Sequence, residues 1–193
     1  LKEGQIGRLT VTNVATHPEV AAARGVRGVP WMRIGPFELT GLHRQDALAR
    51  WVERARSDEG MRAYLSEGLA SGELESVISA CRRSPALLPR LIEMAGDLET
   101  PFAVRIGAGA VLEDLGPDGL LKESVEDFAR LAASPLPQVR ADAAHFLGLS
   151  GSSAAQTLLR QLAGDDDPEV REIAAESLSQ WGRRSENATP GAR

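Results

Sequence analysis

The stretch that decides the fold is VRADAAHFLGLSG, residues 139–151. The same pattern occurs as VRIGAGAVLEDLG at 104–116 and as VREIAAESLSQWG at 170–182, with Val, Arg, Ala, Leu and Gly at offsets of zero, one, four, eight and twelve residues. The repeat period is 35 residues and then 31. Such a period is typical of stacked structural repeats, in which each unit buries its apolar face against the next.

A second amphipathic helix is expected ahead of each copy, because apolar residues recur there at helical spacing. These residues are Leu87, Leu88, Leu91, Ile92 and Ala95, then Val125, Phe128, Leu131 and Ala132, then Ala155, Leu158, Leu159 and Leu162. A cap residue and a proline open the second helix of each pair, at Thr100-Pro101, Ser134-Pro135 and Asp167-Pro168. Each repeat is therefore predicted to be a helical hairpin, and Tyr64 to Cys81 adds a less regular helical pair.

The N-terminal part follows a different pattern, in which short apolar runs alternate with turn residues. This pattern predicts strands at 8–14, 29–34 and 37–39, a short helix over 16–25 capped by Thr16, a tight turn at 34–37 and an amphipathic helix over 44–56. The fold class is thus α/β plus all-α. The predicted parts are a β-α-β-β-α domain over 1–57, a helical domain over 58–182 and a disordered polar tail over 183–193.

The composition limits the classes of function. Of the 193 residues, 42% are hydrophobic but only 4% aromatic, so the core must consist of aliphatic side chains and alanine. A net charge of −5 makes nucleic acid a poor partner. A single cysteine, Cys81, forms no internal disulfide, which favours a reducing, cytoplasmic location. No run is long and apolar enough to span a membrane, and no signal segment opens the chain.

The three copies resemble HEAT-like repeats of the bacterial kind first described in phycobilin lyases. The resemblance rests on the recurring Val-Arg, Ala, Leu and Gly, and on the run 165–169, Asp-Asp-Asp-Pro-Glu, before the last copy. It covers about residues 87–182 and implies a short right-handed α-solenoid that binds proteins. Small alanines let paired helices approach closely, while Val and Leu fill the seams between repeats.

Residues 24–30, Arg-Gly-Val-Arg-Gly-Val-Pro, precede a strand, a glycine turn, a second strand, Gly41 and a helix. This order resembles the C-terminal half of a thioredoxin fold, over residues 7–55. The resemblance implies a cis peptide bond before Pro30 and a substrate-binding loop of Val29, Pro30 and Trp31, although Trp31 departs from the threonine common in that family. A cis bond is energetically accessible before proline.

The redox C-x-x-C of a thioredoxin fold would lie before the strand at 8–14, and the sequence contains no such motif. The central strand of that fold is missing as well, so the strands at 8–14 and 29–34 must pair directly or leave an open seam. We therefore expect the sequence to be incomplete before Leu1, with catalytic cysteines upstream.

Arg105, Arg140 and Arg171 are the candidate protein-binding residues of the helical domain, because they recur once per repeat and could hold an acidic partner. In the alternative interpretation they tie adjacent repeats together through Asp142, Asp167 or Glu172. The acidic run 165–167 is interpreted as helix capping.

Cys81 is predicted to be a small buried residue, although Arg82 and Arg83 could in principle activate it as a nucleophile. His17, His43 and His145 are too far apart in sequence, and too poor in neighbouring ligands, to predict a metal site.

Two functions stay open. One is a thioredoxin-family thiol–disulfide protein whose HEAT-like solenoid recruits a protein disulfide substrate; this chain alone would be inactive, because it has no resolving cysteine. The other is a redox-inactive adaptor that binds partner proteins through both domains. A role like that of a chromophore lyase rests on repeat analogy alone. No cofactor, metal, nucleic acid or membrane is expected to take part.

Overall fold

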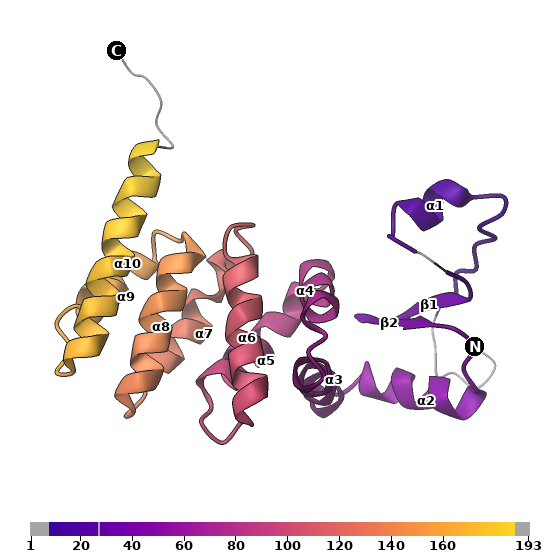
Figure 1. Cartoon of the computed structure of the whole chain (residues 1–193), viewed down its shortest axis with the longest axis horizontal. Coiled ribbons are helices and arrows are strands. Elements are labelled where there is room, and N and C mark those ends of the chain that lie inside the picture. The colour runs from indigo at the N-terminus through magenta and orange to yellow at the C-terminus, as the bar shows by residue number, and fades with distance from the viewer. Residues whose placement is uncertain (1–7, 27, 188–193) are drawn as a thin grey trace, which may run out of the picture. The chain divides into compact units, whose positions relative to one another are not determined.

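The computed structural model describes residues 8–26 and 28–187, and the chain divides into two compact units, Leu1–Tyr64 and Leu65–Arg193. The described residues form ten α-helices, two short 3₁₀ helices and one two-stranded sheet (Figure 1). We expected a boundary after Ser57. The helix α3 (Asp58–Ala70) begins at the next residue, and the boundary between the two units falls within it.

A β-hairpin organises the first unit. Strands β1 (Trp31–Ile34) and β2 (Phe37–Thr40) pair antiparallel, with Ile34 opposite Phe37 and Trp31 opposite Thr40. Gly35 has a φ of +58°, a left-handed conformation that glycine adopts without steric cost. The tight turn predicted at 34–37 is confirmed.

Phe37 is the centre of the core of this unit. Its side chain is fully buried, and its ring centroid lies 5.1 Å from that of Trp51 and 4.5 Å from that of Tyr64. Trp51 belongs to α2 (Gln45–Arg54), the amphipathic helix predicted over 44–56. One aromatic cluster therefore joins the hairpin to α2 and to the middle of α3.

The strand predicted at 8–14 is absent. Residues 8–13 have no regular secondary structure, and Leu9 and Val11 are exposed. A strand needs a neighbour for its N–H and C=O groups, and β1 pairs with β2 alone. The alternating apolar residues of this segment predicted a strand, but no strand in the described part of the chain is available to pair with it. The observed order of the first unit is therefore α-β-β-α, without the first strand of the expected β-α-β-β-α order.

The short helix predicted over 16–25 is present as α1 (Pro18–Ala22), but Thr16 does not cap it. The Thr16 hydroxyl donates to the carbonyl of Asn13 at 3.1 Å, and the residue at the cap position is His17. Asn13 Oδ1 also accepts a hydrogen bond from the backbone N–H of Ala15, so a turn built around Asn13 takes up the residues expected to start the helix.

The second unit consists of helices joined by short loops. After α4 (Leu74–Arg83) and η1 (Pro85–Leu87), three hairpins follow: α5 (Leu88–Gly96) with α6 (Phe102–Leu115), α7 (Val125–Ala132) with α8 (Pro137–Ser150), and α9 (Ala155–Leu162) with α10 (Pro168–Asn187). The short η2 (Lys122–Ser124) leads into α7. Figure 1 shows α6, α8 and α10 side by side as one layer, with α5, α7 and α9 as the other. The predicted hairpins are confirmed, as is the less regular pair, α3 and α4.

The repeated positions form the core of the three hairpins. Each of the following residues is at most 2% exposed: Val104, Val139, Val170, Ala108, Ala143, Ala174, Leu112 and Leu147. Leu178, the last leucine of the pattern, is partly exposed because no described helix packs on the far side of the last hairpin. Neighbouring repeats thus bury one another, as the period implies.

The predicted caps occur at only one of the three hairpins. Asp167 caps α10, because its Oδ1 accepts from the backbone N–H groups of Glu169 and Val170 at 3.0 and 3.3 Å. By contrast, α8 begins at Pro137 rather than after Ser134-Pro135, and α6 follows Pro101 without a side-chain cap. The second proline of Ser-Pro-Leu-Pro sets the start of α8, since proline suits the first helical turn and disfavours a helical residue before it.

The C-terminal helix is longer than expected. We predicted a disordered tail from residue 183, but α10 is helical as far as Asn187, and residues 188–193 lie outside the described part of the chain. Arg, Ser, Glu and Asn are all tolerated in a helix whose earlier turns are anchored by packing, so the loss of apolar period at 183 does not end it. None of the described helices is both long and apolar enough to cross a membrane.

Candidate functional site

Arg140 connects two adjacent hairpins. Its guanidinium donates hydrogen bonds to both carboxylate oxygens of Asp165, at 2.8 and 2.7 Å, and to the backbone carbonyl of Ser134 at 3.0 Å. The two side chains are only 17% and 11% exposed. Because Asp165 lies in the loop between α9 and α10, the pair links α8 to the next hairpin. Asp165, and not the expected Asp142, Asp167 or Glu172, is the partner.

The three recurring arginines differ in their surroundings. Arg171 is exposed and donates to the backbone carbonyls of Asp165 and Asp166, at 2.8 and 2.9 Å. Arg105 lies over the Phe102 ring, with its Cζ 5.8 Å from the ring centroid. Ser134 stands five residues before Val139, as Asp165 stands five before Val170. The position equivalent to Asp165 in the second hairpin is therefore a serine, so Arg105 has no carboxylate there to pair with as Arg140 does.

We expect the pair of Arg140 and Asp165 to make stability depend on acid pH. The hydrogen bonds from Arg140 hold the pKa of Asp165 at about 2, below its ordinary value of 3.8. A carboxyl with a lowered folded-state pKa adds stability above the unfolded pKa, and this stability is lost as pH falls toward the folded value. In urea melts, the free energy of unfolding lost in Asp165→Asn should be constant above about pH 5 and shrink from about pH 4 to pH 2. A loss independent of pH over this range would contradict a stabilising ion pair.

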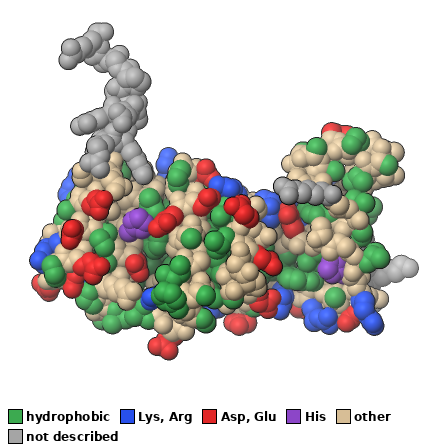
Figure 2. All heavy atoms as spheres, viewed as in Figure 1, with side chains coloured by type: hydrophobic (Ala, Val, Ile, Leu, Met, Phe, Trp, Pro, Cys, Tyr) green, Lys and Arg blue, Asp and Glu red, His purple; other side chains and the backbone are tan. Residues whose placement is uncertain are grey.

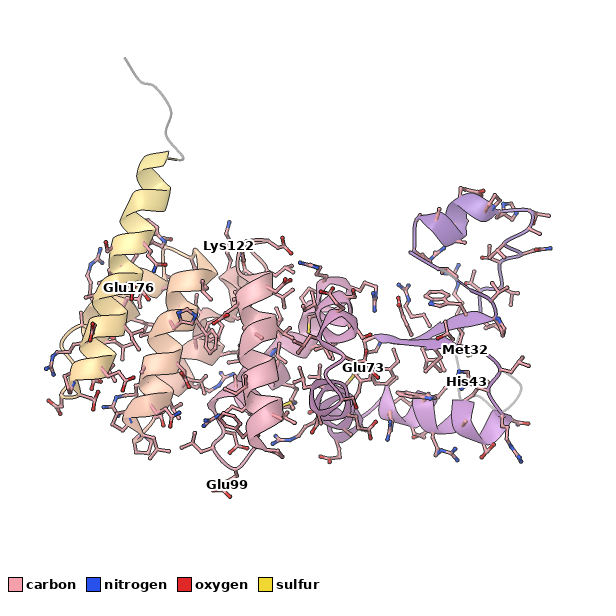
Figure 3. All side chains as sticks on the ribbon, in the orientation of Figure 1. Met32, His43, Glu73, Glu99, Lys122 and Glu176 are labelled. Atoms are coloured by element: carbon pink, nitrogen blue, oxygen red, sulfur yellow. The ribbon has the colours of Figure 1, made fainter. Side chains whose placement is uncertain are left out.

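Exposed apolar side chains gather where α6 begins. Phe102 and Ile106 lie one turn apart on α6 and are 70% and 55% exposed. Leu98, in the loop before α6, and Leu136, in the corresponding loop before α8, are also exposed. Figure 2 shows hydrophobic side chains gathered near this end of α6, and Figure 3 labels Glu99 in the same loop as Leu98. We call Leu98, Phe102, Ile106 and Leu136 the apolar patch.

Acidic side chains follow α10 on the same layer of helices. Glu169, Glu172 and Glu176 are exposed, and their spacing of three and four residues places them on one face of the helix. Figure 2 shows acidic side chains over this part of the unit, and Glu176 is labelled on α10 in Figure 3. We call these three residues the acidic row.

Asp142 on α8 lies between the patch and the row. Burial raises the pKa of its carboxyl, while the charges of Arg105 and His145 act to lower it and that of Glu169 to raise it. Asp142 is thus within electrostatic reach of α6 on one side and α10 on the other. Since α8 contacts both α6 and α10, the exposed faces of these three helices lie next to one another (Figure 1).

The histidines take part in separate local contacts. His145 lies 3.1 Å from Glu113 on α6, His17 lies 3.2 Å from Glu19, and His43 contacts the carbonyl of Thr40 at 3.1 Å. Among the described residues, no three His, Cys, Asp or Glu side chains are grouped to hold a metal ion.

Val29, Pro30 and Trp31 line a cavity of about 650 Å³ within the first unit. Residues 8–14 and α1 form the other walls, and no residue of β2 takes part. The cavity therefore lies beside the edge of β1 that has no partner strand, and it is the open seam expected between the segments 8–14 and 29–34. The Val29–Pro30 peptide bond is cis, as predicted.

Cys81 is a buried residue of α4, as predicted. Burial raises the pKa of its thiol to about 12, so it is protonated and shielded from solvent at neutral pH. Arg82 does not activate it, because its guanidinium donates to Asp114 and Asp118 at 2.8 and 2.9 Å. A nucleophilic role for this thiol has no support.

The sequence analysis missed the apolar patch and the acidic row. A signal was available in the repeat alignment. Phe102 and Ile106 stand two residues before and after Val104, and the equivalent positions around Val170 are Pro168 and Glu172. An apolar side chain at a position that is charged in another copy, as Ile106 is against Glu172, indicates an exposed apolar surface.

Residues 125–190 match the family described as HEAT repeats. This match covers α7 to α10, including the acidic row, and confirms the HEAT-like part of the prediction. HEAT repeats are generally protein-interaction modules. No curated protein and no solved structure matches the chain. Neither the fold of the first unit nor these comparisons support a thioredoxin-like fold.

Proposed function

We propose that the chain is a protein-binding adaptor and that its partner docks on the exposed face of α6, α8 and α10. The observation that carries this proposal is the apolar patch. The repeated apolar positions of the hairpins are buried except for Leu178, whereas Phe102 and Ile106 keep more than half of their surface in water on a folded helix. Grouped apolar residues at a protein surface are typical of contact sites for other proteins.

The three recurring arginines contribute to this function in different ways. Arg140 is paired with Asp165 and stabilises the stacking of the hairpins. Arg105 is a contact residue, because its guanidinium lies beside the exposed Phe102 ring and widens the surface that a partner would cover. Arg171 lies at the start of α10, next to the acidic row, and is the remaining candidate contact.

The adaptor is better supported than a thiol–disulfide function. A redox step by this chain would need a reactive thiolate, and its one cysteine is buried with a raised pKa. Within the adaptor function, Val29, Pro30 and Trp31 are the contact residues that we assign to the first unit, because they line its cavity.

A random peptide library displayed on phage and selected against the full chain tests the proposal. We expect enriched peptides whose binding is lost in Phe102→Ser, because the substitution removes the largest exposed apolar side chain of the patch. The matched control is Leu42→Ser, which removes an exposed leucine from the first unit. Enriched peptides that bind Phe102→Ser as well as they bind the unchanged chain would overturn the proposal, and so would a selection without enrichment.

A further inference from the structure

The charge of the second unit differs from that of the first. Residues 65–193 contain 12 Lys and Arg against 20 Asp and Glu, a net charge of −8, whereas residues 1–64 contain 10 against 7, a net charge of +3. The overall value of −5 conceals this asymmetry. A partner of the second unit meets a strongly negative field, which favours association with a positively charged segment.

Several acidic groups of the second unit have a partner within it. Asp114 and Asp118 bind Arg82, Asp127 binds Arg130, and Asp165 binds Arg140. Glu113 contacts His145. The charges of these five carboxylates are compensated within the unit itself.

The three carboxylates of the acidic row are not paired in this way among the described residues, and they lie together on one face of α10. Neither Glu169 nor Glu172 makes an ion pair with a described residue. Glu176 accepts a hydrogen bond from the side-chain amide of Gln180 at 3.2 Å, which leaves its charge uncompensated within the described part of the chain. The positive end of the helix dipole accounts for Glu169, which lies in the first turn of α10. It does not account for Glu172 and Glu176, because the effect is confined to that turn.

We infer that the partner which docks on this face is a basic segment with an apolar anchor: one large apolar side chain covers the apolar patch, and Lys or Arg side chains pair with the acidic row. This inference rests on the proposed function and names the chemistry of its partner. Charge complementarity carries it, since the face offers exposed apolar area at one side and uncompensated carboxylates at the other.

The arrangement sets the spacing within the partner. The patch and the row are separated by two steps between neighbouring helices of about 10 Å each, hence about 20 Å. An extended segment advances about 3.3 Å per residue, so the first basic residue should lie about six residues from the anchor. The partner would then cross the helices rather than follow one of them.

Two synthetic peptides test the inference on the full chain by fluorescence polarisation. Each peptide carries one tryptophan as its apolar anchor. About six residues after the tryptophan, the first peptide carries four lysines, and the second carries four glutamates at the same positions. We expect the lysine peptide to bind and to weaken as salt is raised, because exposed charge pairs are screened. The combined variant Glu169→Gln, Glu172→Gln and Glu176→Gln should weaken it about tenfold, the effect of losing three exposed ion pairs.

The matched control removes the same charge elsewhere in the unit, with Glu73→Gln, Glu123→Gln and Glu126→Gln, all at exposed positions. It should leave the affinity for the lysine peptide within about twofold, because screening makes exposed charges act locally. If Phe102→Ser abolishes peptide binding, two results would overturn the inference and leave the proposed function in place. The first is equal binding of the lysine and glutamate peptides. The second is equal weakening of the lysine peptide by the two sets of Gln substitutions. No binding of either peptide, or binding that Phe102→Ser leaves intact, would overturn the inference; whether the proposed function also fails is decided by the phage selection.

Discussion

Leu147→Ala should lower the free energy of unfolding of the second unit by about 2–5 kcal/mol. Leu147 is fully buried on α8, which packs against α7, α9 and α10 and also contacts α6. Removal of its side chain leaves a cavity that these helices cannot close without giving up their own contacts. Urea unfolding followed by circular dichroism measures the change, and an unaltered slope with denaturant would show that the folded state is otherwise intact.

Leu178→Ala is the matched control for this prediction, because Leu178 occupies the same position of the pattern in the last copy. It is partly exposed, and no described helix packs on its far side. Its loss should therefore be clearly smaller than that of Leu147. Equal losses would contradict the interpretation that neighbouring repeats bury one another's core positions.

The helical hairpins were predictable because two independent patterns agree there. Apolar residues at helical spacing indicate which side of each helix is buried, and recurrence of Val, Ala and Leu in three copies indicates that these sides face one another. For the strand at 8–14, two such patterns did not agree. The prediction of this strand rested on the alternation of Leu9 and Val11 with polar residues, and alternation does not show which strand would pair with it.

The candidate site was less predictable than the fold. Periodicity identifies Arg140 as a recurring residue, but its partner Asp165 lies 25 residues away in the loop of another hairpin. Which carboxylate meets the guanidinium depends on how far each loop extends, and three other acidic residues were equally plausible from sequence. The exposure of Phe102 likewise depends on the stacking of neighbouring helices, which leaves the start of α6 uncovered.

Gly148→Ala should destabilise the second unit by about 1–3 kcal/mol, although alanine is the better helix former. A Cβ at Gly148 of α8 would lie 2.7 Å from both Cβ and Oγ of Ser177 and 3.3 Å from its Cα. Ser177 is buried on α10, so its short side chain cannot turn away without losing its place in the helix contact. The two helices would have to move apart, and α8 and α10 would lose the close approach that their small residues allow.

Gly109→Ala separates this steric cost from the general effect of replacing a glycine. Gly109 lies within α6, and the nearest atom to its added Cβ is Cζ of Phe146 at 3.7 Å, an ordinary van der Waals contact. Here the helix propensity of alanine should act alone and raise stability by up to about 1 kcal/mol. Opposite signs for the two variants in urea melts are therefore expected. If Gly148→Ala instead raised stability, α8 and α10 would not pack as closely at this position as the short distances to Ser177 indicate.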